Sequence, residues 1–130
     1  MKNTKRLLLV EDESDLRSLY AELLSDKGYT IIEAEDGETT LNYLKEERIG
    51  FDLVLLDEII PKLKGTEILK ILKTDKSIKK PKKIVLMTNL DKESIQKKLK
   101  EIGCDKVEYV IKSSITPMDF LNLVENKLKY

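Results

Sequence analysis

The stretch FDLVLLDEIIP, residues 51–61, contains an unbroken apolar run that ends abruptly on two acids. Residues 53–56 have the length and composition of a strand that is buried on both faces, as in the middle of a parallel sheet. Asp57 and Glu58 follow at once, and Pro61 ends the local pattern. The run therefore predicts a central strand. It leaves two roles open for Asp57: to begin a solvated turn, or to perform chemistry at the end of the strand.

Similar apolar runs recur along the chain and alternate with helical patterns. The runs lie at residues 7–10, 29–32, 53–56, 84–87 and 107–111. Apolar residues three and four positions apart predict five amphipathic helices between and after them, and Gly28 and Gly103 end two of these helices. Thr116, Pro117 and Asp119 suit the first positions of the last helix.

This alternation predicts an α/β fold, a doubly wound five-stranded parallel sheet with helices on both faces. The common strand order for five such (βα) units is 2-1-3-4-5, the flavodoxin-like arrangement. A chain of 130 residues suits a single domain, here residues 1–130. Ligands of such sheets bind at the carboxyl ends of the strands where the winding direction reverses, which is at the first and third strands.

Composition narrows the class of protein. Lys plus Arg and Asp plus Glu both number 24, so no net charge points to nucleic acid or to a membrane surface. The single cysteine, Cys104, excludes an internal disulfide, and the chain shows neither a signal peptide nor a transmembrane run. These features predict a cytoplasmic protein. No histidine is present, which excludes His-based triads and His-ligated metals.

The charges are unevenly spread along the chain. Residues 11–58 hold 15 acids and 4 bases, whereas residues 62–83 hold 9 bases and 2 acids. The basic segment KTDKSIKKPKK, residues 73–83, has no interleaved aromatic residues for stacking on bases. We interpret it as a solvated helix end and loop rather than as a nucleic-acid site, and we expect a local acidic focus in the first half of the chain.

Three carboxylates are expected to converge at the ends of the first and third strands. Glu11 and Asp12 follow the first strand, and Asp57 ends the third. Two unit charges 4 Å apart repel by about 4 kcal/mol at an effective dielectric constant of about 20, so the group requires a cation or raised pKa values. An all-oxygen set of this kind suits Mg²⁺. Glu11 or Asp12 alone is better explained by turn capping, but the three together favour a metal site.

The ends of the fourth and fifth strands supply residues that complement such a site. Thr88 ends the fourth run and Lys112 ends the fifth. A hydroxyl and an ammonium beside carboxylates and a metal can hold phosphoryl oxygens. Taken singly, Thr88 fits an ordinary β-branched strand residue, and Lys112 fits a solvated strand end or a counter-ion to the acids.

These motifs resemble the receiver domain of the response regulators of bacterial two-component systems. The resemblance rests on VED, LLDEIIP, MTN and YVIK after or within four of the strands, and it runs from about residue 5 to residue 129. It implies that Asp57 accepts a phosphoryl group from a sensor histidine kinase or a phosphotransfer protein. It further implies Mg²⁺ held by Glu11, Asp12, Asp57 and the backbone carbonyl of Ile59, with Thr88 and Lys112 on the phosphoryl oxygens.

The resemblance also implies a signalling domain that is not an enzyme, apart from catalysing its own phosphorylation and dephosphorylation. Phosphorylation in this family biases a conformational switch, for which Thr88 and Tyr109 occupy the matching positions. The output surface comprises the fourth helix, the fifth strand and the fifth helix, and it binds a downstream protein or a second copy of the chain. Direct contact with nucleic acid or membrane is not implied. The sequence leaves open whether the receiver stands alone, as in the chemotaxis regulator, or precedes an output domain.

Several positions depart from the usual pattern of the family. Asn89 stands where a small residue is usual, which suggests restricted access to the phosphorylated residue. Ser113 replaces the usual proline, so the isomer of the preceding peptide bond is left open. Lys62 and Lys64 make the loop after the third strand unusually basic.

Two further positions concern the lifetime of the phosphorylated state. In the receiver family, the residues two after the phosphorylated aspartate and two after the threonine flank the path of the attacking water. Here they are Ile59 and Leu90, both aliphatic. They predict slow self-dephosphorylation.

Three other classes compete with this interpretation. A metal-dependent phosphatase with an aspartyl nucleophile carries a second aspartate two residues after the first, where this chain has Ile59. A flavin-binding module needs a phosphate loop rich in Ser, Thr and Gly after the first strand, whereas EDESD at residues 11–15 would repel a phosphate. A degenerate receiver that binds partners without phosphorylation is disfavoured, because all five chemical positions are filled.

Overall fold

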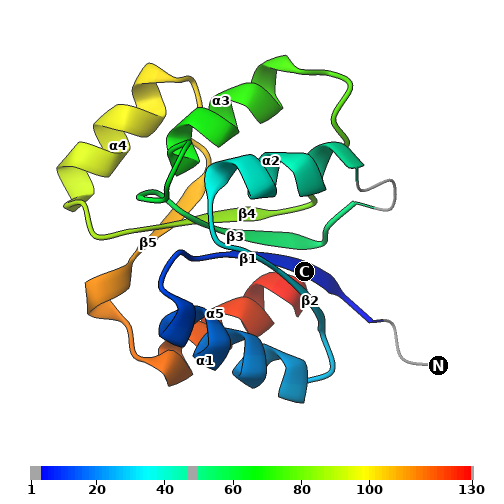
Figure 1. Ribbon diagram of the computed structural model, residues 1–130. Coiled ribbons are helices and arrows are strands. Elements are labelled where there is room, and N and C mark those ends of the chain that lie inside the picture. Colours follow the sequence, from blue (N-terminus) through cyan, green and yellow to red (C-terminus); the bar gives the residue numbers. More distant parts are fainter. Residues whose placement is uncertain (1–3, 47–49, 130) are drawn as a thin grey trace.

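The computed structural model describes residues 4–46 and 50–129, and within them strands and helices alternate along the chain (Figure 1). The strands are β1 (Arg6–Val10), β2 (Thr30–Ala34), β3 (Leu53–Asp57), β4 (Ile84–Thr88) and β5 (Glu108–Ile111). The helices are α1 (Ser14–Asp26), α2 (Gly37–Glu46), α3 (Gly65–Thr74), α4 (Lys92–Glu101) and α5 (Pro117–Lys129), and a 3₁₀ turn, η1 (Lys112–Ser114), precedes α5. Each predicted apolar run therefore lies in or overlaps a strand.

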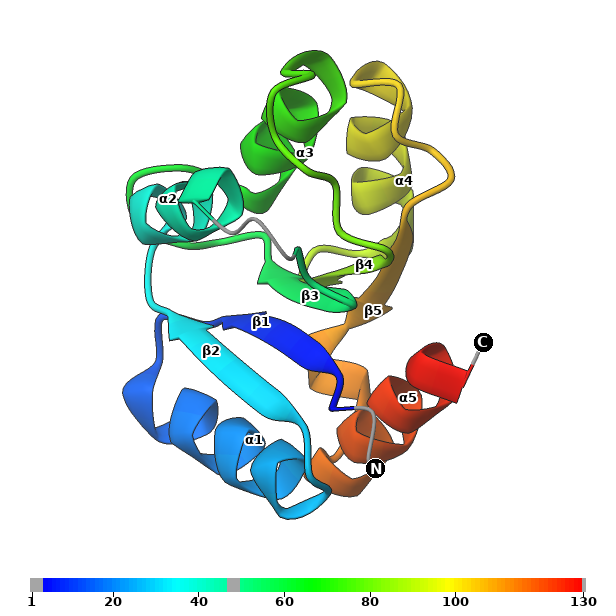
Figure 2. The ribbon, with the colours of Figure 1, turned by 90° about the vertical axis from the view of Figure 1, so that its right-hand side faces the viewer.

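All five strands are parallel and follow the order β2-β1-β3-β4-β5, which confirms the predicted doubly wound sheet. Helices α1 and α5 cover one face of the sheet, and α2, α3 and α4 cover the other (Figure 1, Figure 2). The crossovers on the two sides of β1 run in opposite directions along the sheet. The ends of β1 and β3 therefore border the crevice at which this fold binds its ligands.

The central strands supply two hydrophobic cores, because successive side chains of a strand point to opposite faces. Leu8 and Val10 belong to the core under α2, α3 and α4, whereas Leu7 and Leu9 belong to the core under α1 and α5. Every residue of β3 is buried, which explains why this strand reads as a continuous apolar run.

Helices α1 and α5 are joined by an aromatic contact. The rings of Tyr20 and Phe120 stack with their centroids 3.9 Å apart and their planes 16° from parallel. Leu19 lies at helical spacing from the other apolar residues of α1, but it is 41% exposed and does not contribute to this core. The buried face of α1 comprises Tyr20, Ala21 and Leu24, so it is narrower than the set of apolar residues at helical spacing in this helix.

The start of α5 has the predicted capping residues. The Thr116 N–H donates to Asp119 Oδ2 at 2.9 Å, and the Asp119 N–H donates to Thr116 Oγ1 at 3.1 Å. This reciprocal pair satisfies two donors that the first helical turn leaves free. It fixes the beginning of α5 shortly after Lys112. Across the described ranges, no helix combines the length and the apolar composition needed to span a membrane.

Candidate functional site

The register of the strands brings the predicted residues to one end of the sheet. Val10 pairs with Leu56, so the residues that follow, Glu11 and Asp57, lie side by side at the ends of β1 and β3. Thr88 ends β4, the neighbour of β3, and it is fully buried. The site is therefore built from strand ends, whose positions are fixed by the ladder of the sheet.

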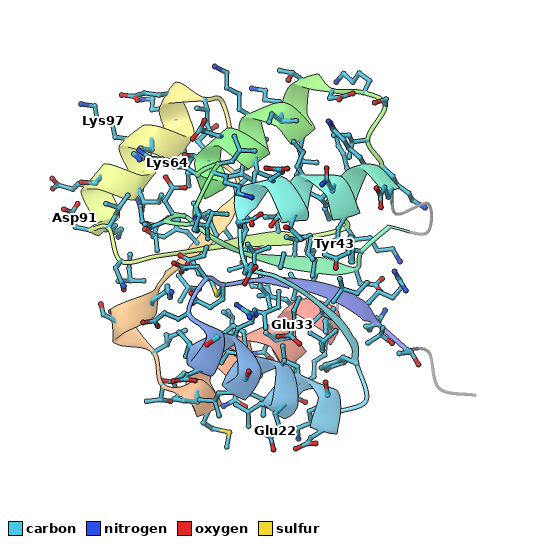
Figure 3. All side chains as sticks on the ribbon, viewed as in Figure 1. Glu22, Glu33, Tyr43, Lys64, Asp91 and Lys97 are labelled. Atoms are coloured by element: carbon cyan, nitrogen blue, oxygen red, sulfur yellow. The ribbon has the colours of Figure 1, made fainter. Side chains whose placement is uncertain are left out.

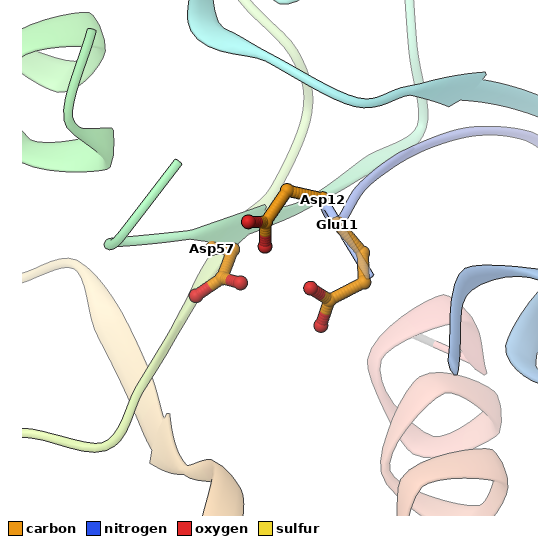
Figure 4. A group of neighbouring side chains, drawn as sticks. All are labelled: Glu11, Asp12 and Asp57. Carbon is orange, nitrogen blue, oxygen red and sulfur yellow. The ribbon is translucent and has the colours of Figure 1, made fainter. Parts of the chain in front are cut away.

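Glu11, Asp12 and Asp57 form a carboxylate cluster (Figure 4). Each contributes an oxygen, and these oxygens lie within 4.8 Å of one another. Glu11 and Asp57 are buried, 0% and 4% exposed, whereas Asp12 is exposed to solvent. Three oxygen donors with one open side suit Mg²⁺, which binds a few carboxylates and keeps several of its waters.

Lys112 reaches this cluster from the turn after β5. Its Nζ lies 2.6 Å from Glu11 Oε1 and 3.0 Å from Asp57 Oδ2. The lysine side chain is 14% exposed, so little solvent screens these three charges. One ammonium thus faces two buried carboxylates, and the ionised cluster carries excess negative charge even before Asp12 is counted.

The pKa values of the three partners reflect this imbalance. Burial, reinforced by the charge of Glu11, raises the pKa of Asp57 to about 7 against the opposing effect of Lys112. Burial also opposes ionisation of Glu11, but hydrogen bonds from Lys112 and from the Glu13 N–H outweigh it and lower the Glu11 pKa. The pKa of Lys112 is raised, because its bonds to the two acids outweigh the cost of its burial. Asp57 is therefore the carboxylate that lacks sufficient compensation.

The loop after β4 and the turn after β5 are joined beside the cluster. Asn89 Oδ1 accepts a hydrogen bond from the Ser113 N–H at 3.0 Å, and Thr88 Oγ1 accepts one from the Leu90 N–H at 3.0 Å. The described residues contain no cis peptide bond, so the Lys112–Ser113 bond is trans. Asn89 is exposed and serves here as a connection between two loops.

Tyr109 lies on β5 and contacts α4. Its hydroxyl accepts a hydrogen bond from Gln96 Nε2 at 2.9 Å, and its ring packs against the core beneath α2, α3 and α4. The second residue predicted to take part in a switch, Thr88, lies on the adjacent strand β4. The two residues therefore occupy neighbouring strands, and one of them is bonded directly to α4.

The loop between β3 and α3 carries the predicted basic residues. Lys62 has a φ of 75°, in the left-handed region that favours glycine. Its Nζ lies 3.6 Å from Asp36 Oδ2 and 3.4 Å from Glu38 Oε2, both at the start of α2. The lysine thus connects the loop to α2, in a conformation that costs about 1 kcal/mol for a residue with a side chain. Ile59, in the same loop, is 58% exposed.

Glu58 is a buried acid beside the site that the sequence reasoning did not single out. Its Oε1 accepts from the Thr66 N–H at 2.7 Å, and its Oε2 accepts from Thr66 Oγ1 at 2.9 Å and from Lys98 Nζ at 3.1 Å. The side chain is 0% exposed. No local pattern signals this role, because the partners lie 8 and 40 residues away in the chain.

A cavity of about 570 Å³ lies at the opposite end of the strands, against the beginnings of β4 and β5. Its lining includes the apolar side chains of Leu72 and Ile84 and the lysines Lys73, Lys80 and Lys106. None of the predicted site residues lines it. The predicted site and this cavity therefore lie at different ends of the sheet.

Comparison with known proteins agrees with the fold and the motifs. A family model described as the response regulator receiver domain matches residues 7–124. The phosphate regulon transcriptional regulatory protein PhoB of Klebsiella pneumoniae is 32% identical over 108 residues, which cover 83% of this chain and 45% of that protein. The transcriptional regulatory protein CpxR of Escherichia coli (strain K12) is 43% identical over 68 residues, which cover 52% of this chain and 28% of that protein. The chain thus spans less than half the length of these curated relatives.

Solved structures show the same architecture. A CheY-like response regulator receiver domain protein from Methanospirillum hungatei JF-1 is 25% identical, with a TM-score of 0.77 over 98% of this chain and 95% of that chain. The chemotaxis response regulator CheY4 of Vibrio cholerae is 23% identical, with a TM-score of 0.80 over 97% of this chain and 100% of that chain. The second likeness is evidence of fold alone.

Proposed function

Because the chain belongs to the response regulator receiver domain family, a signalling family of two-component systems, we propose that Asp57 accepts a phosphoryl group from a sensor histidine kinase or a phosphotransfer protein. The observation that carries this proposal is the position of Asp57, buried at the end of β3 with excess negative charge around it and a pKa of about 7. A buried carboxylate with excess negative charge around it gains from a cation that neutralises its surroundings.

Glu11, Asp12, Asp57 and the backbone carbonyl of Ile59 would hold Mg²⁺ in this proposal. The donor set supports it, because oxygen ligands with an exposed side fit this ion. The bound cation supplies positive charge that favours the ionised, nucleophilic form of Asp57. The exposed position of Asp12 leaves the approach to the cluster open to solvent and to a phosphodonor.

The transfer is a substitution at phosphorus. A carboxylate oxygen of Asp57 forms the new O–P bond while the N–P bond of the phosphohistidine breaks, and the electron pair returns to the imidazole of the donor. Lys112 already lies 3.0 Å from Asp57 Oδ2, so its ammonium can neutralise a phosphoryl oxygen without a large movement. The Thr88 hydroxyl accepts from the Leu90 N–H, which leaves its own hydrogen free to donate to the phosphoryl group.

The signal then passes to the surface formed by α4, β5 and α5. When the Thr88 hydroxyl bonds to the phosphoryl group, it pulls on the loop that leads into α4. Tyr109 already connects β5 with α4 through its bond to Gln96. We propose that this surface binds a downstream protein or a second copy of the chain. The contacts that Thr88 and Lys112 would make with the phosphoryl group are thereby coupled to a surface that a partner can reach.

The test is phosphorylation by acetyl phosphate with Mg²⁺, read by intact mass. The wild-type protein should gain one phosphoryl group, and Asp57→Asn should gain none. The neighbouring buried acid provides a matched control, since Glu58→Gln should still be labelled. Chelation of Mg²⁺ should prevent labelling of the wild type. An unlabelled wild type would favour the degenerate receiver, and comparable labelling of Asp57→Asn would refute the assignment.

A further inference from the structure

Glu58 fixes the beginning of α3 to the end of β3. The Gly65 N–H donates to the Glu58 carbonyl oxygen at 3.0 Å. A Cβ at Gly65 would lie 2.7 Å from the Asp57 carbonyl oxygen, so the helix backbone rests directly against this peptide. The Glu58 carboxylate also accepts both donors of Thr66 in the first turn of α3. Glu58 therefore has little freedom to move relative to β3 and α3.

Helix α4 is held differently. It lies beside α3 on the same face of the sheet (Figure 2), and it buries only Ile95 and Leu99. Polar contacts contribute to its position: Gln96 donates to the Tyr109 hydroxyl, and Lys98 Nζ lies 3.1 Å from Glu58 Oε2. With a narrow apolar face, α4 depends on such contacts more than α3 does.

The Glu58–Lys98 ion pair therefore joins a fixed element to a more weakly held one. The Glu58 side chain is 0% exposed and that of Lys98 is 37% exposed. If Lys98 leaves, Glu58 keeps its two bonds from Thr66, and the lysine regains water. The buried carboxylate thus keeps two donors when the pair opens, which lowers the cost of opening relative to an ion pair whose members have no other partner.

We propose that the Glu58–Lys98 pair restrains α4 in its unphosphorylated position and thereby opposes phosphorylation of Asp57. The proposal rests on the proposed function, because the motion arises when a phosphoryl group on Asp57 recruits Thr88. That recruitment pulls the loop at residues 89–91, which runs into α4, whereas Glu58 cannot follow it. Movement of α4 relative to α3 must stretch or break the pair, so the pair favours the resting arrangement.

The size of the effect follows from the exposure of Lys98. The coupling energies that double-mutant cycles give for partly exposed ion pairs correspond to about a two- to fivefold change in an equilibrium constant. A ligand or modification shifts a conformational equilibrium only by its differential interaction with the two states. Loss of the pair should therefore raise the rate of phosphorylation by acetyl phosphate about two- to fivefold, without altering the residues that hold the phosphoryl group.

The experiment compares Glu58→Gln and Lys98→Met with Lys97→Met. The glutamine is nearly isosteric and can keep the bonds to Thr66 while losing the charge that attracts Lys98. Lys97 is a matched control, since it lies on the same helix, is exposed and projects outward (Figure 3). Two quantities are measured: the initial rate of phosphorylation by acetyl phosphate with Mg²⁺, and amide hydrogen exchange in α4 of the unphosphorylated protein.

Glu58→Gln and Lys98→Met should each be phosphorylated faster than wild type, and exchange in α4 should rise in both. A protein that carries both substitutions should be phosphorylated no faster than either single variant. Lys97→Met should match wild type in both measurements. Unchanged or slower phosphorylation in Lys98→Met with unchanged exchange would overturn the proposal, whatever the fate of Glu58→Gln. If the wild type accepts no phosphoryl group, the proposed function fails. Amide hydrogen exchange in α4 then decides whether the pair restrains this helix. Exchange at the wild-type rate in Glu58→Gln and Lys98→Met would refute the restraint as well.

Discussion

Asp57 and Glu58 are consecutive acids that are buried to a similar degree, 4% and 0% exposed, yet their surroundings differ. Asp57 competes with Glu11 for a single ammonium, and its pKa is raised to about 7. Glu58 accepts hydrogen bonds from both donors of Thr66 and from Lys98. Burial alone therefore does not distinguish the carboxylate that we propose as the phosphoryl acceptor from one that only stabilises the fold. The distinction lies in whether the neighbouring donors and cations fully compensate the charge.

The largest expected effect concerns the compensated acid. Glu58→Ala should lower the free energy of unfolding by about 3 kcal/mol, because it removes three hydrogen bonds and leaves the Thr66 N–H buried without its acceptor. Urea unfolding measures this change. Glu67→Ala is the comparison, since Glu67 is an exposed acid in the first turn of α3 that accepts a hydrogen bond from the Lys64 N–H, and its loss should cost about 1 kcal/mol or less.

A loss below 1 kcal/mol in Glu58→Ala would show that the bonds around Glu58 contribute little. Glu58 and Asp57 would then differ only in their hydrogen-bonding partners and in the raised pKa of Asp57. A loss near 3 kcal/mol would establish that Glu58 contributes strongly to the stability of the fold, in contrast to the role that we propose for Asp57.

The second expected effect is a gain in the free energy of unfolding, and its size depends on pH. In the absence of Mg²⁺, Asp57→Asn should raise the free energy of unfolding at pH 8 by about 2 kcal/mol. The Asp57 pKa is about 7 in the folded protein and near 3.8 when unfolded, so the folded state binds more protons between these values. Wild-type stability attributable to Asp57 is fully present below about pH 4 and falls as pH rises toward 7.

The gain from Asp57→Asn should therefore shrink when unfolding is measured at pH 5 in place of pH 8, with a chelator in both samples. Loss of the Asp57 bond to Lys112 limits the gain to less than the pKa shift alone would give. An equal gain at both pH values would mean that the asparagine acts through packing, and a loss at pH 8 would mean that Lys112 fully compensates Asp57.

The fold could be predicted because its determinants are local. Central parallel strands read as apolar runs, and their alternation with helical patterns restricts the topology. Once the strand order is assumed, the residues at the strand ends follow. Glu11, Asp57, Thr88 and Lys112 are separated by up to 101 residues, yet the ladder of the sheet fixes them as neighbours. The approximate site thus follows from topology, without any local signal at each residue.

The features that the sequence did not reveal depend on side-chain direction in turns. Glu58 looks like the second acid of a solvated turn, and only the folded chain brings Thr66 and Lys98 to it. The bond from the Ser113 N–H to Asn89 spans 24 residues and two loops, and it has no periodic signature. Leu19 shows the reverse error, because an apolar residue at helical spacing can still lie outside the covered face of the helix.

The smallest effect concerns how each acid is shielded from water. Glu58 is enclosed by its donors, whereas the two positions that flank the phosphoryl group in the receiver family are here Ile59, which is 58% exposed, and the half-buried Leu90. Neither side chain can hydrogen-bond a water or present a charge to it. We expect slow loss of the phosphoryl group, since hydrolysis needs a water aligned with the bond that breaks.

Ile59→Asn and Leu90→Glu should each accelerate this loss severalfold, because one water-orienting contact is worth about 1 kcal/mol in the barrier. Asn89 could oppose the effect by orienting water itself, but its Oδ1 already accepts from the Ser113 N–H. The measurement is the decay of phosphorylated protein after removal of acetyl phosphate, with the aliphatic replacements Ile59→Val and Leu90→Met as controls. Decay at the wild-type rate in both polar variants would show that water access to Asp57 is controlled elsewhere. Equally fast decay in the aliphatic controls would assign the protection to side-chain shape instead of polarity.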